Sequence, residues 1–229
     1  MKICIVVPAY NEESVIGDVV DDIKETFRDK KYSSEVVIVN DRSTDDTAEN
    51  AKKATVIDHL INQGAGGATS TGLRYAKLHK ADWVITLDGD GQHKASDALS
   101  CLEQAMKLEA DLLIGSRLIN KKGMSKVKIL GNKGLTIITF LLFGINVTDS
   151  QSGLRIFSQQ AIDVLEWKST GYDFCSEMLW RAKKANLKIA EYPIQAIYTD
   201  YSKSKGQNNW NAINIVKSLV RRRIVEMFE

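Results

Sequence analysis

The segment Trp83-Val84-Ile85-Thr86-Leu87-Asp88-Gly89-Asp90 is the most informative stretch of this 229-residue chain. Its first five residues form an apolar run, which predicts a buried strand. Asp88 and Asp90 follow directly on a turn of the kind that glycine permits. Carboxylates so placed suit a hard divalent cation, which commonly shares its ligands with substrate phosphates. The segment therefore predicts a site for Mg²⁺ or Mn²⁺ and a diphosphate at the end of a strand.

A second strand that ends in an acid lies upstream, where residues 36–40 run into Asp41. The first 116 residues alternate such apolar runs with amphipathic stretches, and the runs cover residues 2–7, 36–40, 55–60, 83–87 and 111–114. Continuously apolar strands separated by helices indicate an α/β fold, with a mostly parallel sheet covered on both faces. Ligands bind such sheets at the carboxyl ends of the strands. Residues 8–12, Asp41 and the Asp88 turn all fall there.

Polar residues predict where the helices of this first half begin. Asn11 is expected to cap the first helix, with Glu12 and Glu13 in its first turn. Residues 43–46 resemble a capping box for the second helix. Two more helices are expected, from about Gly67 to His79 and over residues 97–108. A dinucleotide-binding loop is disfavoured, because the glycines at 64, 66 and 67 lack the required spacing and the first strand has no glycine-rich turn.

The second half is less regular. We expect a helix over the apolar residues 135–145, a strand at 154–157, a helix at 173–185, one or two strands within 187–197, and a helix at 211–228. The chain contains no linker and no internal repeat, which favours one domain over residues 1–229. Within it, residues 1–116 would bind the nucleotide, and residues 117–229 would form a helical, acceptor-binding and membrane-facing part.

Charge is distributed unevenly along the chain. The net charge of +2 is too small to indicate nucleic-acid binding. Residues 112–148 and 201–225, however, contain basic but no acidic side chains. Two such stretches in a nearly neutral chain favour an anionic partner over an ordinary solvated surface.

The cysteine pattern and the apolar segments address localisation. Three widely spaced cysteines do not form a disulfide framework, which fits a reducing cytoplasm. The first apolar run is too short for a signal peptide and ends at Pro8. Residues 135–145 would span only about 16 Å as a helix, too short to cross a bilayer. This stretch is then a core helix, a segment lying on anionic lipid or a homodimer contact; with the basic residues beside it, it favours peripheral association with the cytoplasmic face of a membrane.

Individual side chains are candidates for binding phosphate, metal and base. Asp90 is the best metal ligand, Asp88 can bind metal or sugar, and Gln92 adds an amide oxygen. Asp41 would hydrogen-bond a nucleobase or ribose, or else cap the next helix. Arg117 follows a strand and can bind a phosphate bidentately. Arg155 would either help with the phosphates or pair with Asp149.

Four motifs carry a family resemblance. Residues 6–12 (VVPAYNE), 39–45 (VNDRSTD), 88–93 (DGDGQH) and 115–117 (GSR) resemble the inverting family 2 glycosyltransferases of GT-A fold. Within that family the dolichyl-phosphate mannose and glucose synthases are most similar. Residues 149–155 resemble their Asp-x-x-Ser-Gly-aromatic-Arg/Lys segment, with Leu154 in place of the aromatic residue.

The resemblance implies transfer of a hexose from UDP- or GDP-hexose to a polyprenyl or dolichyl phosphate, with anomeric inversion. A lipid phosphate is already anionic, so the reaction needs no strong base. The alternative is a family 2 enzyme that adds sugar to a glycan hydroxyl, for which Asp149 would be the base. A non-catalytic nucleotide-binding module is a third reading.

The implied residues fall into four sets. The catalytic set is Asp88, Asp90, Arg117 and Asp149, and the metal set is Asp88, Asp90 and Gln92. The nucleotide-sugar set is Pro8, Tyr10, Glu12, Val39, Asp41, Asp88, Gly89, Asp90, Gln92 and Arg117. The acceptor-phosphate set is Arg117, Lys128, Arg155, Lys203 and Lys205. Lys203 and Lys205 would replace an arginine that the synthases carry in the region that corresponds to residues 198–207. This difference leaves the sugar and the base of the donor open.

Overall fold

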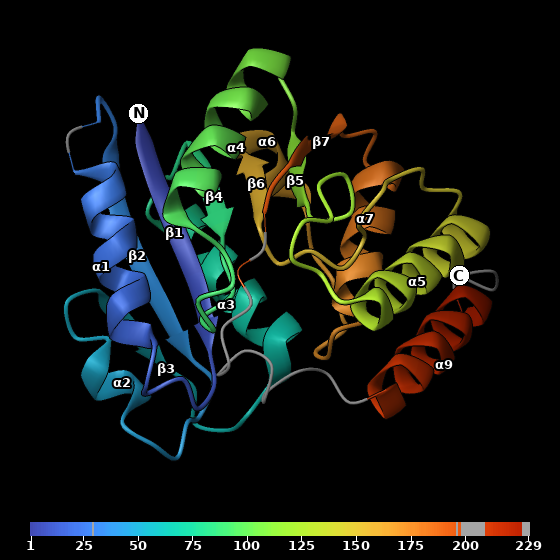
Figure 1. The fold of residues 1–229 in the computed structure, drawn as a ribbon. Helices are drawn as coiled ribbons and strands as arrows, with labels where there is room; N and C mark the ends of the chain where they lie inside the picture. Colours follow the sequence, from blue (N-terminus) through green and yellow to red (C-terminus); the bar gives the residue numbers. More distant parts are fainter. Residues whose placement is uncertain (29, 196, 198–208, 226–229) are drawn as a thin grey trace.

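The computed structural model describes residues 1–28, 30–195, 197 and 209–225 (Figure 1). Its strands are β1 (Lys2–Ala9), β2 (Ser33–Asn40), β3 (Thr55–Asp58), β4 (Trp83–Thr86), β5 (Leu112–Ser116), β6 (Arg155–Ser158) and β7 (Ile189–Pro193). Its helices are α1 (Ile16–Phe27), α2 (Thr47–Asn50), α3 (Gly64–Leu78), α4 (Ala95–Leu108), α5 (Lys126–Phe143), α6 (Gln159–Val164), α7 (Phe174–Lys184) and α9 (Asn209–Val225).

The strands of the described residues form one sheet in the order β3-β2-β1-β4-β6-β5-β7. Strands β3, β2, β1 and β4 pair in parallel, as do β5 and β7, whereas β6 is antiparallel to both of its neighbours. The prediction of a mostly parallel central sheet flanked by helices is confirmed. Strands β6 and β7 come from beyond residue 117, so both halves of the chain build the same sheet.

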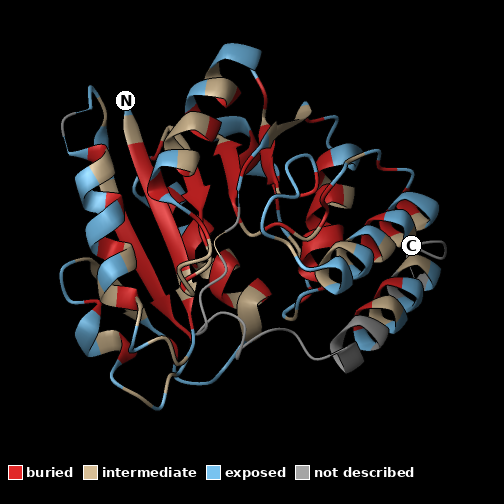
Figure 2. Ribbon diagram, in the orientation of Figure 1, coloured by how far each residue is buried: buried red, intermediate tan, exposed pale blue. Residues whose placement is uncertain are grey.

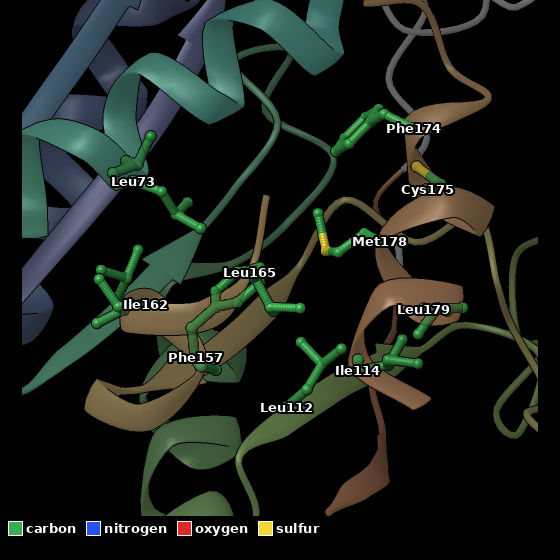
Figure 3. Close-up of a cluster of buried hydrophobic side chains, with 14 of the residues drawn as sticks. Leu73, Leu112, Ile114, Phe157, Ile162, Leu165, Phe174, Cys175, Met178 and Leu179 are labelled. Atoms are coloured by element: carbon green, nitrogen blue, oxygen red, sulfur yellow. The ribbon is translucent and has the colours of Figure 1, made fainter. Parts of the chain in front are cut away.

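Apolar side chains fill both sides of the sheet, which explains why its strands are continuously apolar. In β1, Ile3, Ile5 and Val7 pack with α1 and α4 on one face. Cys4 and Val6 pack on the other face with α3, α6 and α7. Figure 2 shows β1, β4, β5 and β6 buried along most of their length. Figure 3 shows part of the second cluster, including Ile114, Phe157 and Met178.

Helix starts are where the sequence predictions fail most clearly. Asn11 does not cap α1, which begins five residues later; it adopts φ +55° and its side-chain oxygen accepts a hydrogen bond from Thr44 N at 2.8 Å. Ser43 forms no capping box either, because its hydroxyl accepts from Asn11 N at 3.0 Å. These polar side chains tie the loops after β1 and β2 together. Helix α3 begins at Gly64 rather than after Gly67, and α6 was not predicted.

Helix α5 is longer than predicted, since it begins inside the basic segment at Lys126. Ser125 caps it by accepting a hydrogen bond from Lys128 N, and Gly144 ends it with φ +64°. Leu135, Thr136, Thr139 and Phe143 are buried, while the opposite side of the helix is exposed. Among the described residues, no helix is both long and apolar enough to cross a membrane. Helix α9 lies beside α5 (Figure 1).

Candidate functional site

The Asp88–Asp90 turn follows β4 and packs against the end of β1. Leu87 N donates to Val6 O at 3.1 Å, which continues the sheet pairing up to the turn. A Cβ at Gly89 would lie 3.1 Å from Pro8 O, so glycine allows this close approach. Gly91 has φ +73°, a conformation that glycine adopts without strain. The turn therefore depends on two glycines that hold two carboxylates at the carboxyl edge of the sheet.

The pKa values of the two carboxylates are shifted in opposite directions. Burial opposes the charge of Asp88, but the His93 ring, whose Nε2 lies 3.2 Å from Asp88 Oδ2, and the nearby guanidiniums of Arg117 and Arg155 lower its pKa. Burial and then the charge of Asp88 raise the pKa of Asp90. Asp90 also accepts a hydrogen bond from Gln92 N at 3.0 Å and contacts the Gln92 carboxamide. Concentrated negative charge of this kind favours binding of a cation.

Gly153 is a site residue to which we assigned no role from the sequence. A Cβ at this position would lie 2.1 Å from Asp88 Oδ1 and 2.2 Å from Oδ2, so the carboxylate packs directly on the glycine backbone. Gly153 O also accepts from Thr86 Oγ1 at 2.8 Å. Only a residue without a side chain leaves Asp88 in this position.

Arg117 and Asp149 form a buried ion pair. Asp149 accepts hydrogen bonds from Arg117 Nε (2.8 Å), Nη2 (3.0 Å) and backbone N (3.1 Å). Asp149 is 0% exposed, and burial opposes its charge, but Arg117 lowers its pKa. The sequence analysis left open whether Arg155 pairs with Asp149; the structure shows that Arg117 is the partner.

Arg155 and Lys128 differ in their surroundings. Arg155 is 1% exposed; its Nη2 donates to Ser150 O at 2.8 Å, and its guanidinium lies 5.6 Å from the centre of the Phe174 ring. Lys128 lies in the first turn of α5. Burial and the charge of Arg117 lower its pKa, and Asp90 opposes that shift. Lys128 therefore shares the electrostatic environment of Arg117 and Asp90, whereas Arg155 lies beneath the site in the protein interior.

The antiparallel direction of β6 explains how these residues meet. Asp41, Asp88 and Arg117 follow the carboxyl ends of β2, β4 and β5. Because β6 runs the opposite way, its amino end, preceded by residues 149–154, lies at the same edge. One edge of the sheet thus collects side chains from segments more than 100 residues apart.

The residues predicted to hold the nucleoside differ in their burial and in their hydrogen-bond partners. Tyr10 is 47% exposed on the loop after β1. Asp41 is buried and accepts from Gln63 N (2.8 Å), Gly64 N (2.7 Å) and the ring of His59 (2.8 Å), so it fixes the start of α3 rather than of α2. The Val39 side chain is fully buried in the core on the face of the sheet that α3 covers. Pro8 lies near the end of β1, and Glu12 follows Tyr10 on the loop.

The loop between α6 and α7 contributes Tyr172, which the sequence analysis missed. Tyr172 is 46% exposed. Partial desolvation by the surrounding protein and then the charge of Asp88 raise its pKa to about 12, and Asp90 contributes to this shift. Glu177 holds the loop by accepting from Lys168 N (3.1 Å) and Ser169 N (2.8 Å). The glycines at the start of α3 approach this loop, and Gly66 N donates to Thr170 O at 2.7 Å. No sequence signal tied these segments together.

The turn fits a divalent cation that is shared with a substrate. Among the described residues, no group of three or more His, Cys, Asp or Glu side chains is arranged to hold a metal ion. Asp88 and Asp90 supply two oxygen donor groups, and Mg²⁺-type sites commonly complete such a shell with substrate phosphates and water. Lys203 and Lys205 lie outside the described residues. Ile197, which precedes their segment, donates to Gln92 O at 2.9 Å.

Comparison with known proteins identifies the family. The family model described as glycosyl transferase family 2 matches residues 4–165. An uncharacterised protein of Methanocaldococcus jannaschii is 42% identical over 97% of this chain and 93% of its own length. The UDP-N-acetylglucosamine–dolichyl-phosphate N-acetylglucosaminyltransferase of Methanococcus voltae is 40% identical over 90% of each chain.

Solved structures share the fold. The glucosyl-3-phosphoglycerate synthase of Mycobacterium tuberculosis, crystallised with Mn²⁺ and UDP-glucose, matches with a TM-score of 0.71 and 19% identity, over 96% of this chain and 76% of its own. The mannosyl-3-phosphoglycerate synthase of Rubrobacter xylanophilus matches with a TM-score of 0.74 and 16% identity, over 99% of this chain and 74% of its own. With the strand-end carboxylates and the extent of the family match, these findings show that the chain belongs to glycosyl transferase family 2.

Proposed function

We propose that this enzyme transfers a hexose from a nucleotide diphosphate sugar to a polyprenyl or dolichyl phosphate, with inversion at the anomeric carbon. The observation that carries the proposal is the Arg117–Asp149 pair at the same sheet edge as Asp88 and Asp90. It puts a fixed cation beside two carboxylates suited to a metal–diphosphate. Such a site serves two phosphate-bearing substrates, a donor and an acceptor.

The state of Asp149 favours an acceptor that is already anionic. A hydroxyl acceptor requires a base that removes its proton. Asp149 was the candidate, but its carboxylate receives three hydrogen bonds from Arg117, and its lowered pKa makes it a weak base. A phosphate oxygen of the acceptor can instead attack the anomeric carbon directly while the bond to the nucleoside diphosphate breaks. Arg117 and Lys128 then orient the acceptor phosphate.

On the donor side, Asp88 and Asp90, with Gln92, would hold Mg²⁺ or Mn²⁺. The cation, when bound, neutralises charge that develops on the departing diphosphate. The fold neighbour crystallised with Mn²⁺ and UDP-glucose supports this assignment. Gly89 lets the Asp88–Asp90 turn pack against Pro8 O. Tyr10, Glu12 and Asp41, which follow the neighbouring strands β1 and β2, would hold the nucleoside. Since the 40% identical relative is named for UDP-N-acetylglucosamine, we take a UDP-sugar as the first donor to test.

Helix α5 supplies the surface for the lipid. Its outward side exposes Leu130 (74%), Ile137 (57%) and Leu141 (73%), and Lys126 and Lys133 lie on the same helix. An amphipathic helix with apolar and basic side chains binds at the interface of an anionic membrane. Its first turn carries Lys128 next to the site, so a helix resting on the bilayer would bring the acceptor phosphate to Arg117. The enzyme would therefore associate peripherally with the membrane.

A transfer assay with labelled donors tests the proposal. Labelled UDP-N-acetylglucosamine, UDP-glucose and GDP-mannose are offered with polyprenyl phosphate and Mn²⁺ or Mg²⁺. We expect label to enter an organic-extractable, mild-acid-labile lipid from one donor. Asp90→Ala should abolish transfer, whereas Asp163→Ala, a 53% exposed carboxylate on α6, should not change it.

If no lipid is labelled, the result favours the alternative reaction, which is transfer to a glycan hydroxyl. If metal-dependent donor binding is seen but no lipid is labelled with any donor, the acceptor is a hydroxyl of a glycan and the proposal is wrong. In that case Asp149→Asn would abolish transfer to a glycan acceptor, because Asp149 would then be the base.

A further inference from the structure

Glu191, in the edge strand β7, binds the loop that holds the site together. Its carboxylate accepts hydrogen bonds from Thr148 N at 2.8 Å, from Thr148 Oγ1 at 2.8 Å and from Asp149 N at 3.2 Å. Three donors from two consecutive residues therefore converge on one side chain. A carboxylate, which only accepts hydrogen bonds, matches this arrangement.

The side chains of both residues that Glu191 binds contact the turn that carries Arg117. Asp149 holds the Arg117 guanidinium through Nε and Nη2. The Thr148 hydroxyl lies 2.6 Å from the Ser116 hydroxyl, and Ser116 Oγ accepts from Ile119 N at 3.4 Å. The side chains of Thr148 and Asp149 thus fix the residue before Arg117 and Arg117 itself. Glu191 binds both of these residues.

The register between β5 and β7 places Glu191 close to the Arg117 turn. Strand β7 pairs in parallel with β5, and Glu191 lies opposite Ile114, three residues before Arg117. The strands continue in register to Ser116 and Pro193, so movement of Glu191 relative to the Arg117 turn is restricted. Glu191 also borders a cavity of about 500 Å³ between β7 and residues 144–147. It is only partly buried, so a substitution there leaves the main core intact.

From these contacts we infer that Glu191 is a positioning residue, which sets the orientation of the Arg117 guanidinium through Thr148 and Asp149. It does not touch the substrates. The inference rests on the proposed function in one respect, which is that Arg117 orients the acceptor phosphate.

The variant Glu191→Gln tests the inference at nearly constant volume. Its amide NH₂ would face the N–H groups of Thr148 and Asp149, so at least one donor loses its acceptor. We expect kcat with lipid phosphate to fall about tenfold, as for other residues that orient a functional side chain, and the affinity for the nucleotide sugar to stay unchanged. In an Arg117→Ala background the same substitution should have less than about a twofold effect, because the two residues act as one unit.

Asp111→Asn is the matched control. Asp111 also uses a carboxylate to hold β7, since it accepts from Lys188 N at 2.8 Å and from Ser158 Oγ at 3.0 Å, but it does not bind residues 148–149. If Glu191 merely stabilised β7, the two variants would behave alike. Equal losses in both variants, or an undiminished effect of Glu191→Gln in the Arg117→Ala background, would overturn the inference.

A second measurement separates this inference from the proposed function. In protein labelled with ¹⁵N-arginine, the Nε–H signal of Arg117 is identified by its loss in Arg117→Ala. We expect Glu191→Gln, but not Asp111→Asn, to shift that signal and to speed its exchange with solvent. Absence of lipid-linked product in the wild type would reject the proposed function alone, whereas an unchanged Arg117 signal in Glu191→Gln would reject the positioning role.

Discussion

The variant Gly153→Ala should disable the enzyme without unfolding it. The new Cβ would lie 2.1 Å from Asp88 Oδ1, so the carboxylate must retreat to the 3.4 Å of ordinary van der Waals contact. In doing so it leaves the position next to Asp90 and His93. A misplacement of about 1 Å in a catalytic constellation costs roughly 100-fold in rate, and we expect a loss of this size in kcat.

The stability of the same variant should change little. The atoms nearest to the new Cβ belong to the end of one side chain, which can rotate away, and Gly153 is not among the residues with positive φ. The control is Gly17→Ala in α1, where the nearest atom, Asn50 O, is 3.5 Å from the added Cβ. That change should stabilise the protein by up to about 1 kcal/mol, because alanine favours helix over glycine, and should leave transfer unchanged.

The assay is sugar transfer with a metal titration, combined with urea unfolding of both variants. We expect Gly153→Ala to need more Mn²⁺ for half-maximal activity in addition to its lower kcat. Wild-type transfer and metal dependence in Gly153→Ala would refute the reasoning, since they would mean that the position of Asp88 against Gly153 does not matter. Unfolding of Gly153→Ala in buffer would refute it as well.

Three further predictions concern charge, thiols and the lipid surface. Asp149→Asn should lower transfer about 10- to 100-fold without abolishing it. Because the folded pKa of Asp149 is lowered, its contribution to the free energy of unfolding should be complete above the ordinary aspartate pKa of about 3.9 and should be lost as the pH falls through the folded value. Urea unfolding at several pH values should therefore show a smaller loss of stability at acid pH in Asp149→Asn than in the wild type. Burial raises the pKa of Cys4 and of Cys101 to about 12, so both thiols should resist a disulfide reagent at pH 8 until the protein is unfolded, and rapid labelling of the folded chain would contradict their burial. The triple substitution of Leu130, Ile137 and Leu141 by serine should weaken binding to phosphatidylglycerol vesicles at least about tenfold, whereas Leu78→Ser on α3, which is 80% exposed, should not; unchanged vesicle binding together with loss of a dimer in sedimentation velocity would assign this face to a second copy of the chain.

The sequence by itself determined the class of fold and the edge of the sheet that carries the chemistry. Residues 36–39 and 83–85 are apolar without alternation, which is typical of strands in a sheet covered on both faces. Acids placed directly after these runs had to lie at the carboxyl ends of the strands. Both inferences rest on local patterns, in which neighbours along the chain remain neighbours in the structure.

Tertiary structure decided which side chains meet at that edge. The antiparallel direction of β6 brings Asp149 and Gly153 to Arg117 and Asp88, and no local pattern encodes the direction of a four-residue strand. Asn11 illustrates the same limit, because its sequence context fits a helix cap, yet its side chain binds a loop 33 residues away. Contacts of this kind depend on the mutual placement of whole strands. The pairing of Arg117 with Asp149 and the packing of Asp88 on Gly153 could therefore be identified only in the folded chain.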